Sequence, residues 1–424
     1  MHRRFGPVYG QRPAVPLRGE LMRTAFVVGV IMSTLVARAP ARATDPAGTL
    51  HWVAIANSSF DVYTQNPTQA QKDWMRAHYW RMLTYSPYFD SRVSWFPDAW
   101  VYKDLYAIYT GSTLASAHPD WILKDASGNK LYIPYGCSGG TCPQYAADVG
   151  NPAFRANWIQ EATATVAKGY RGIFVDDVNM LISRVGNGSG SAVAPLDPRT
   201  NATMTEADWR RYMAEFVEQI RTAFPDKEIV HNALWFAGVA DASVQRELLA
   251  ANTICLERGV NDSGIVGGTG QYGFDTFLSQ IDWLHAHGRA AFFLPGVSSS
   301  TAREYGVAAY FLVSAGSDAM GNDPGAGTSP SDWWSGYGVS LGAAHGDRYV
   351  WNGLLRRDFD GGMVLLNRPG SSQQTAALGA AYTNIAGQQV TSVTLGAAQG
   401  AVLRRPTTST LPTAPHALDA TKAP

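Results

Sequence analysis

The sequence has little cysteine and no excess of charge of either sign. Only three of its 424 residues are cysteine, and no Cys/His group has the spacing of a zinc site. Lysine plus arginine and aspartate plus glutamate number 34 each, so the chain lacks the basic surplus of a nucleic-acid-binding protein. It also contains no Walker motif and no His-Glu-x-x-His. We therefore expect no nucleic-acid partner, no metal and no organic cofactor.

Long apolar runs are scarce as well, and the N-terminal region holds the one that stands out. Arginines between Arg3 and Arg23 precede an apolar stretch from Thr24 to Ala37, and Ala41-Arg42-Ala43 follows as a small-x-small cleavage pattern. We interpret residues 1–43 as a signal peptide, with Met22 as an alternative start and an uncleaved membrane anchor as the alternative interpretation. The stretch is shorter than the about 20 residues of a comfortable membrane span. We predict a secreted or periplasmic protein without membrane contact after cleavage.

The three cysteines fit an oxidising compartment. Cys137 and Cys142 flank Ser-Gly-Gly-Thr, a short flexible segment that can close a small disulfide loop. Cys255 lies inside an apolar run, and we predict a buried free thiol there.

Between residue 50 and about residue 345, short apolar runs alternate with longer amphipathic stretches, as in βα units around a parallel sheet. We predict an α/β fold: a (β/α)₈ TIM barrel over residues 44–345, a small C-terminal all-β domain over residues 346–405 and a disordered tail over residues 406–424. Two long connections, Thr110–Tyr145 and Leu181–Met204, follow predicted strand ends, where such a barrel builds its active site. The predicted barrel strands are Trp52–Ile55, Arg81–Tyr85, Leu105–Tyr109, Gly172–Asp176, Glu228–Asn232, Thr253–Glu257, Ala290–Leu294 and Ser317–Met320.

Helix starts are marked by capping residues. Asn66-Pro67 and Asn151-Pro152 each have the pattern of a cap followed by proline at the first helical position. Thr205, with Asp208 three residues later, predicts a capping box at the start of a helix with one apolar face.

Two acidic residues end apolar strands. Asp176 follows Gly172–Val175, and Glu257 follows Thr253–Leu256. A buried charge is costly unless it faces a polar cavity or finds a partner. Glycosidic cleavage needs one carboxylate as nucleophile or base and one carboxylic acid to protonate the leaving oxygen. We therefore assign Asp176 as nucleophile or base and Glu257 as general acid/base, with a turn cap and a salt bridge to Arg258 as their structural alternatives.

Further side chains near the predicted strand ends are candidates for sugar contacts. Because successive strand residues point to opposite sides, we expect one of Asp176 and Asp177 to face the mouth and favour Asp176. For His231, a role as a hydrogen-bonded core residue is at least as well supported as a substrate contact. Trp95 and Trp100 are candidates for one wall of a groove. The predicted substrate-binding residues are Tyr85, Asp177, Asn179, Asn232, Trp235 and Asp323.

These motifs carry a resemblance to a known family. Gly-Ile-Phe-Val-Asp-Asp-Val-Asn at 172–179, His-Pro-Asp-Trp-Ile-Leu-Lys-Asp-Ala-Ser-Gly-Asn at 118–129 and Asp-Val-Gly-Asn-Pro-Ala-Phe-Arg at 148–155 resemble segments of hypothetical glycosyl hydrolase family 15. The resemblance covers roughly residues 50–370 and implies a (β/α)₈ glycosidase. It points to Asp176, because α-amylase-like, α-galactosidase-like and endo-α-1,4-polygalactosaminidase-like barrels also place a catalytic carboxylate at the end of strand four.

The favoured function is a secreted glycoside hydrolase acting on a poly- or oligosaccharide, with α-linked glycans among the candidates. The alternative is a non-catalytic carbohydrate-binding barrel, in which the carboxylates only hydrogen-bond hydroxyl groups. The separation of the Asp176 and Glu257 carboxyl groups distinguishes these cases: about 5 Å is typical of a retaining pair and roughly 6.5–9.5 Å of an inverting pair. The sequence does not indicate the sugar, the linkage or the oligomeric state.

Overall fold

The structure is a computed structural model that describes residues 45–55, 58–322 and 327–406. The predicted signal peptide, the tail beyond residue 406 and Asp323 lie outside the described residues. Across the part that is described, no helix is both long and apolar enough to cross a membrane.

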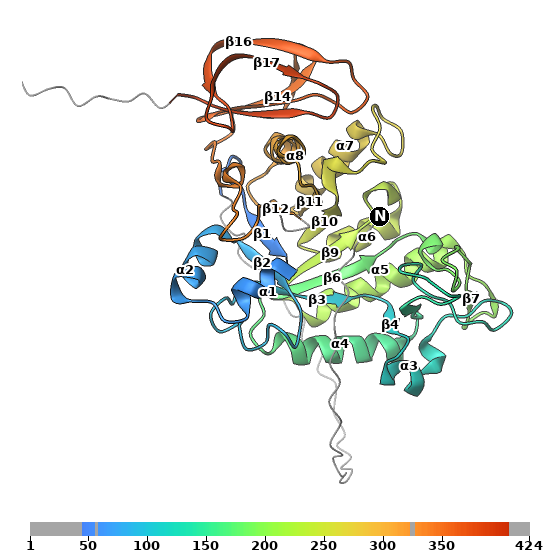
Figure 1. The fold of residues 1–424 in the computed structure, drawn as a ribbon. Helices are drawn as coiled ribbons and strands as arrows, with labels where there is room; N and C mark the ends of the chain where they lie inside the picture. The colour runs from blue at the N-terminus through green and yellow to red at the C-terminus, as the bar shows by residue number, and fades with distance from the viewer. Residues whose placement is uncertain (1–44, 56–57, 323–326, 407–424) are drawn as a thin grey trace, which may run out of the picture. The chain divides into compact units, whose positions relative to one another are not determined.

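Eight parallel strands close into a barrel in the order β1-β12-β11-β10-β9-β6-β3-β2 (Figure 1). The barrel strands are short and almost wholly buried, because they lie between the packed interior and the surrounding helices. The predicted fold class is therefore confirmed. The strands are β1 (Trp52–Ile55), β2 (Arg81–Thr84), β3 (Ala99–Asp104), β6 (Gly172–Val178), β9 (Glu228–Ala233), β10 (Thr253–Glu257), β11 (Ala290–Leu294) and β12 (Ala319–Gly321).

Helices connect the barrel strands, and their first turns follow capping rules. Thr205 and Asp208 form the predicted capping box, and Asn151 accepts hydrogen bonds from the first turn of the helix at Pro152. The prediction for Asn66 was wrong, because Thr68 is the N-cap and forms its own capping box with Gln71. The helices are α1 (Ser58–Thr64), α2 (Gln69–His78), α3 (Thr113–Ala117), α4 (Pro152–Val166), α5 (Glu206–Ala223), α6 (Ala242–Ala250), α7 (Phe274–Ala286) and α8 (Ser300–Val313).

The third barrel strand differs from the prediction. It is β3, Ala99–Asp104, and not Leu105–Tyr109. Residues Ala107–Tyr109 form β4, which pairs with β5 (Gln144–Ala146) in a separate antiparallel hairpin. Trp100, predicted as a groove wall, is therefore a buried barrel residue. The pattern was hidden because β3 carries Lys103 on its outer side, where its ammonium pairs with Glu161 of α4 at 2.8 Å.

An ion-pair network closes the N-terminal end of the barrel interior. Glu228 of β9 accepts hydrogen bonds of 2.8 Å from Arg81 of β2 and from the Trp100 indole of β3. These strands are not neighbours of β9, so the contacts cross the interior. Arg171, directly before β6, donates to the same carboxylate at 2.8 Å. Burial favours the neutral acid, but the two arginines and the indole outweigh it and lower the pKa of Glu228 from 4.5 to about 2.

The C-terminal region is a six-stranded antiparallel sheet. One of its faces packs on α8 and shares the barrel core through Leu355, Val364 and Val402, whereas the other face has a small core of its own. The strands, in the order β13-β14-β15-β18-β16-β17, are β13 (Tyr349–Trp351), β14 (Leu354–Phe359), β15 (Gly362–Leu366), β18 (Gly400–Arg404), β16 (Gln374–Thr383) and β17 (Gln389–Leu395).

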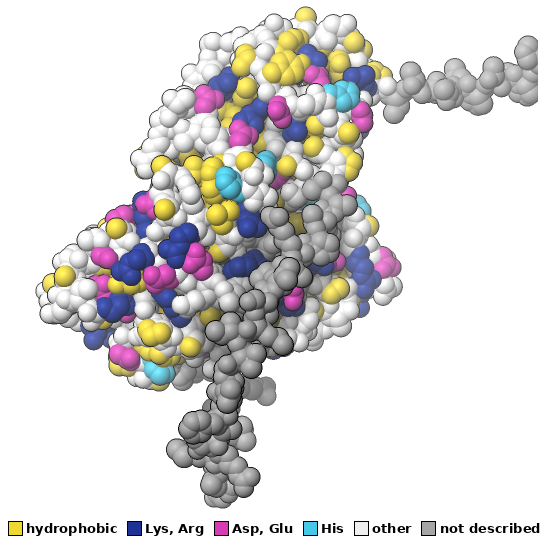
Figure 2. All heavy atoms as spheres, turned by 180° about the vertical axis from the view of Figure 1, so that it is seen from behind, with side chains coloured by type: hydrophobic (Ala, Val, Ile, Leu, Met, Phe, Trp, Pro, Cys, Tyr) yellow, Lys and Arg dark blue, Asp and Glu magenta, His cyan; other side chains and the backbone are white. Residues whose placement is uncertain are grey.

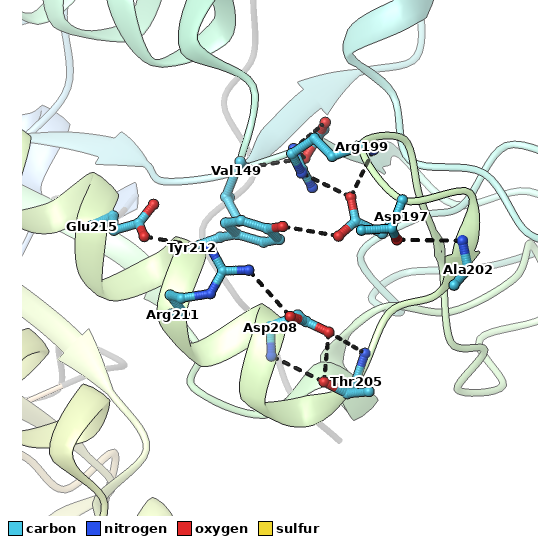
Figure 3. Close-up of polar contacts among 12 residues, drawn as sticks. Val149, Asp197, Arg199, Ala202, Thr205, Asp208, Arg211, Tyr212 and Glu215 are labelled. Carbon is cyan, nitrogen blue, oxygen red and sulfur yellow. Dashed lines mark hydrogen bonds and ion pairs between the residues drawn. The ribbon is translucent and has the colours of Figure 1, made fainter.

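The two long connections are joined to each other. The second contains a short hairpin, β7 (Leu196–Asp197) with β8 (Ala202–Thr203). Tyr212 of α5 donates to Asp197 at 2.9 Å, and Arg199 pairs with Asp197 at 2.8 Å (Figure 3). Arg199 also donates to both oxygens of the buried Asp148, three residues after the first connection, at 2.9 and 3.0 Å. The network thus holds both connections against the barrel.

The first connection also carries a disulfide between Cys137 and Cys142, and Cys255 is a buried free cysteine. Positive and negative side chains are interspersed on the molecular face seen in Figure 2, in line with the balanced composition.

Candidate active site

Polar side chains gather inside the barrel at the C-terminal ends of its strands. The rings of Phe174 in β6 and Phe292 in β11 lie 6.5 Å apart although these strands are not neighbours, so both rings face the interior. Strand alternation then places Asp176 on the interior side with Phe174. The register pairs Asp176 with Asp104 of β3, which brings Asp104 to the same end.

Asn232 of β9 joins the two carboxylates that the sequence singles out. Its Nδ2 donates to Asp176 Oδ1 at 2.7 Å and to Glu257 Oε2 at 3.2 Å. Because one nitrogen lies at these distances from both oxygens, the oxygens are at most about 5.9 Å apart. An amide nitrogen carries two hydrogens, so it can serve both acceptors at once.

Asp176 is buried and richly hydrogen-bonded. Its Oδ2 accepts from the Tyr102 hydroxyl at 2.6 Å, and its Oδ1 accepts from the backbone N–H of Asp177 at 2.8 Å as well as from Asn232. Such donors favour the ionised carboxylate. Burial, followed by the charges of Asp176, Asp104 and Asp177, raises the pKa of Tyr102 well above its usual value, so this phenol remains a donor.

Asp177 does not follow strand alternation. Its φ is 55°, and the pairing of β6 with β9 shifts register between Val175 and Val178. Oxygens of both aspartates lie within 4.8 Å of an Asp104 oxygen, so both carboxylates reach the same cluster and the expected alternation does not hold here. Its Oδ1 accepts from Asn179 Nδ2 at 2.9 Å. Backbone strain of this kind is concentrated at functional sites, and Arg258, directly after Glu257, also has a positive φ of 67°.

Sequence reasoning missed two residues of this site, Asp104 and Tyr102, because it placed the third strand wrongly. Asp104 Oδ1 accepts from the backbone N–H groups of Tyr106 and Ala107 at 3.1 and 2.8 Å. Burial, then the negative charges of Asp177 and Asp176, raise the pKa of Asp104 well above its usual value. One oxygen from each of the three aspartates lies within 4.8 Å of the other two, close enough for the three to coordinate one cation. A signal for β3 was present in Ala99-Trp-Val-Tyr, an apolar run that ends two residues before an acid.

Of the other predicted contact residues, Tyr85 borders the site, whereas Trp235 and His231 pack against helices outside the barrel. Tyr85 lies beside the site, with its ring 5.0 Å from that of Tyr102. Trp235 is buried and packs edge to face on Phe277 of α7 at 5.2 Å. His231 points to the outside of the barrel, where its Nδ1 lies 2.8 Å from the buried Glu247 of α6. The structure thus brings Asp176, Asp177, Asn179, Asn232 and Glu257 together, and Tyr85 borders them.

Comparison with known proteins gives a family match over part of the chain. Residues 78–246 match the sequence model of the family described as hypothetical glycosyl hydrolase family 15. The segment includes Asp104, Asp176 and Asn232, whereas Glu257 lies beyond it. The resemblance seen in residues 172–179 is therefore confirmed over this segment. No curated protein sequence matches the chain.

The chain is similar to solved structures of a glycoside hydrolase domain, a cyclic maltosyl-maltose hydrolase and an alpha-amylase. The glycoside hydrolase domain of PelA from Pseudomonas aeruginosa is 16% identical over 66% of this chain and 95% of its own, with a TM-score of 0.38. Cyclic alpha-maltosyl-(1→6)-maltose hydrolase from Arthrobacter globiformis is 11% identical over 85% and 99%, with a TM-score of 0.42. The maltogenic alpha-amylase AmyB from Thermotoga neapolitana is 10% identical over 84% and 98%, with a TM-score of 0.46.

Proposed function

We propose that the chain is a secreted glycoside hydrolase that cleaves O-glycosidic bonds of a poly- or oligosaccharide with retention of anomeric configuration. The observation that carries this proposal is the amide of Asn232, which contacts both Asp176 and Glu257. Oxygens at most about 5.9 Å apart suit the separation of about 5–5.5 Å of a retaining pair better than the 6.5–9.5 Å of an inverting pair. Secretion is supported by the signal-peptide pattern of residues 1–43.

Asp176 is the nucleophile in this proposal. Its donors, Tyr102 and Asn232, favour the ionised form that attack requires. A carboxylate oxygen of Asp176 bonds to the anomeric carbon while the bond from that carbon to the leaving oxygen breaks. The product of this first step is a glycosyl ester on Asp176.

Glu257 is the general acid and then the general base. It gives its proton to the leaving oxygen in the first step. It next takes a proton from water, which attacks the same anomeric carbon and releases the Asp176 carboxylate. Asn232 holds both groups in this arrangement, because rotating its amide would turn its oxygen toward two acceptors.

The test is hydrolysis of a panel of α- and β-linked polysaccharides by the chain from Thr44 onward, beside Asp176→Asn and Glu257→Gln. Asp282→Asn is a matched control, because this carboxylate is half exposed and pairs with Arg348 away from the strand ends. We expect one glycan to be cut by the wild type and the control, with most activity lost in both site variants.

The anomeric form of the first product, followed by NMR, tests the mechanism. Retention agrees with the proposal, and an inverted first product rules out Asp176 as nucleophile. If the wild type binds a glycan without cutting it, and both site variants bind it equally well, the chain is a carbohydrate-binding barrel and the catalytic assignment fails.

A further inference from the structure

Asp104 is held in one orientation at the C-terminal end of β3. The Trp158 indole of α4 donates to its backbone carbonyl at 2.8 Å. Its Oδ1 accepts from two backbone N–H groups, those of Tyr106 and Ala107. The side chain therefore cannot turn away from Asp176 and Asp177, whose oxygens lie within 4.8 Å of an Asp104 oxygen.

The other carboxyl oxygen of Asp104 lacks a hydrogen-bond donor among the described residues. Oδ2 is buried and has no hydrogen-bond partner within the part of the chain that the structure describes. A buried acceptor without a donor costs free energy, and an ionised one costs more. A proton on Oδ2 removes this cost, because it neutralises the acid and turns the atom into a donor on a residue that has two carboxylates within 4.8 Å of one of its oxygens.

The donors around the cluster indicate which aspartate carries that proton. Asp176 accepts from Tyr102, Asn232 and the N–H of Asp177, and Asp177 accepts from Asn179. Hydrogen bonds from such donors stabilise a charged carboxylate. Asp104 has no comparable donor on Oδ2.

We propose that Asp104 is a positioning residue that is protonated at neutral pH and donates its one O–H from Oδ2 to a carboxylate oxygen of the Asp176–Asp177 pair. The role given to Asp176 rests on the proposed function. The proton reduces the negative charge beside the nucleophile and fixes the carboxylate orientation. The direction of the Asp104 pKa, raised by burial first and by Asp177 and Asp176 next, agrees with this.

Other charged and titratable groups near Asp104 leave this assignment intact. Tyr102, on the same strand and side, has a pKa raised mainly by burial and is neutral. Lys103 points outward to Glu161 of α4. Glu257 of β10 reaches the cluster through Asn232. A bound cation is the competing way to balance three carboxylates, so the experiment must separate a proton from a cation.

The experiment measures thermal unfolding of the chain from Thr44 onward against pH, for the wild type and Asp104→Asn. Asparagine keeps the acceptor for Tyr106 and Ala107 and offers a permanent N–H donor in place of the carboxyl proton. An acid whose pKa is raised in the folded state stabilises the fold below its unfolded pKa, and this stability is lost as pH rises toward the folded pKa. We therefore expect the melting temperature of Asp104→Asn to rise relative to that of the wild type as pH increases above about 4. Near neutrality the difference should be about 2 °C or more.

Asp318→Asn is the matched control, since Asp318 is also buried but accepts from two backbone N–H groups and pairs with His285. We expect this control to melt lower than the wild type at every pH. A difference between Asp104→Asn and the wild type that does not grow with pH overturns the proposal. So does a wild-type melting temperature that EDTA lowers and Ca²⁺ or Mg²⁺ restores while Asp104→Asn does not respond, because a cation then balances the cluster.

Activity gives the second readout. Asp104→Ala should lose about tenfold or more of the hydrolytic activity, because it removes the donor. Asp104→Asn should lose less than Asp104→Ala, and its activity should extend to higher pH. Equal losses in the two variants contradict a positioning proton. If no glycan is cut by any form, the proposed function fails, and the melting series still decides the protonation of Asp104.

Discussion

The two ends of the barrel interior both hold carboxylates, and their surroundings differ. At the N-terminal end, Glu228 pairs with Arg81 and Arg171, and its pKa falls to about 2. At the C-terminal end, Asp104 lies within 4.8 Å of Asp176 and Asp177, and its pKa is raised by burial and by those neighbours. The first carboxylate is balanced by opposite charge, and the second is crowded by like charge.

The difference separates a structural role from a chemical one. A partly buried carboxylate with two guanidinium partners recovers part of its desolvation cost, and it fixes how strands β2 and β9 face each other across the interior. Clustered aspartates recover little of their desolvation cost, because their neighbours carry the same charge. Such a cluster at strand ends is therefore expected where the chemistry of the site requires it. Variants at the two ends should therefore separate activity from stability.

The largest effect is expected for Asp176→Asn. Loss of the nucleophile should reduce kcat by roughly 10⁴-fold or more. The melting temperature should stay the same or rise, because one charge of a like-charged cluster is removed. Steady-state kinetics on the cleaved glycan and a thermal melt measure both. If this variant melts far below the wild type, Asp176 stabilises the fold, and the distinction between a structural N-terminal end and a chemical C-terminal end is wrong.

Glu228→Gln should show the reverse behaviour. The Arg81 side chain is only 2% exposed, and it would lose its carboxylate partner inside the barrel. We expect about 3–5 kcal/mol less unfolding free energy in urea, with unchanged kcat per folded molecule at low temperature. Asp282→Asn, which breaks a more exposed ion pair, should cost at most about 1 kcal/mol. Equal losses in these two variants would show that the buried network contributes no more than a surface pair.

Lowering the pH should reduce the unfolding free energy through protonation of Glu228 at the N-terminal end of the barrel. The folded-state pKa of Glu228 is lowered, so its ion pairs stabilise the fold above the unfolded value near pH 4.5 and are lost as pH falls toward 2. The loss should reach about 3 kcal/mol, and urea unfolding of the wild type at several pH values measures it. Glu228→Gln should show a shallower slope over this range. Asp104, whose pKa is raised, has the opposite sign and loses stability as pH rises.

The sequence correctly predicted the strands in which an apolar run ends in an acidic residue. This pattern indicates a buried strand whose C-terminal end opens to a polar site. β6 and β10 are of this kind, and the positions of Asp176 and Glu257 follow from them. β3 was missed because its last residues alternate between an outward lysine and inward polar groups that face the mouth. The neighbouring run Leu105–Tyr109 is more uniformly apolar, although part of it belongs to a hairpin.

Two features of the site depend on contacts that a linear pattern does not encode. Asp176 and Asp177 reach the same cluster because Asp177 has a positive φ. Aspartate tolerates this conformation, but its presence in a sequence does not predict it. The bridge by Asn232 depends on the register of β6, β9 and β10 around a closed barrel. Sequence reasoning could place these residues at one mouth, but it could not supply their pairing.

The smallest effect is expected for Tyr102→Phe, which changes one hydrogen bond at the C-terminal end and keeps the ring. The hydroxyl donates to Asp176 Oδ2 at 2.6 Å, and a bond to a charged group contributes about 1.5–3 kcal/mol. We expect kcat to fall by about tenfold or somewhat more, and the acidic limb of the pH profile to move upward, because a carboxylate with fewer donors is protonated more easily. Tyr170→Phe is the matched control, since its buried hydroxyl donates to Asp90 at 2.9 Å, a carboxylate that the proposed mechanism does not use. If both variants shift the pH profile equally, the shift reflects a general loss of order in the barrel, whereas a shift confined to Tyr102→Phe ties this phenol to the nucleophile.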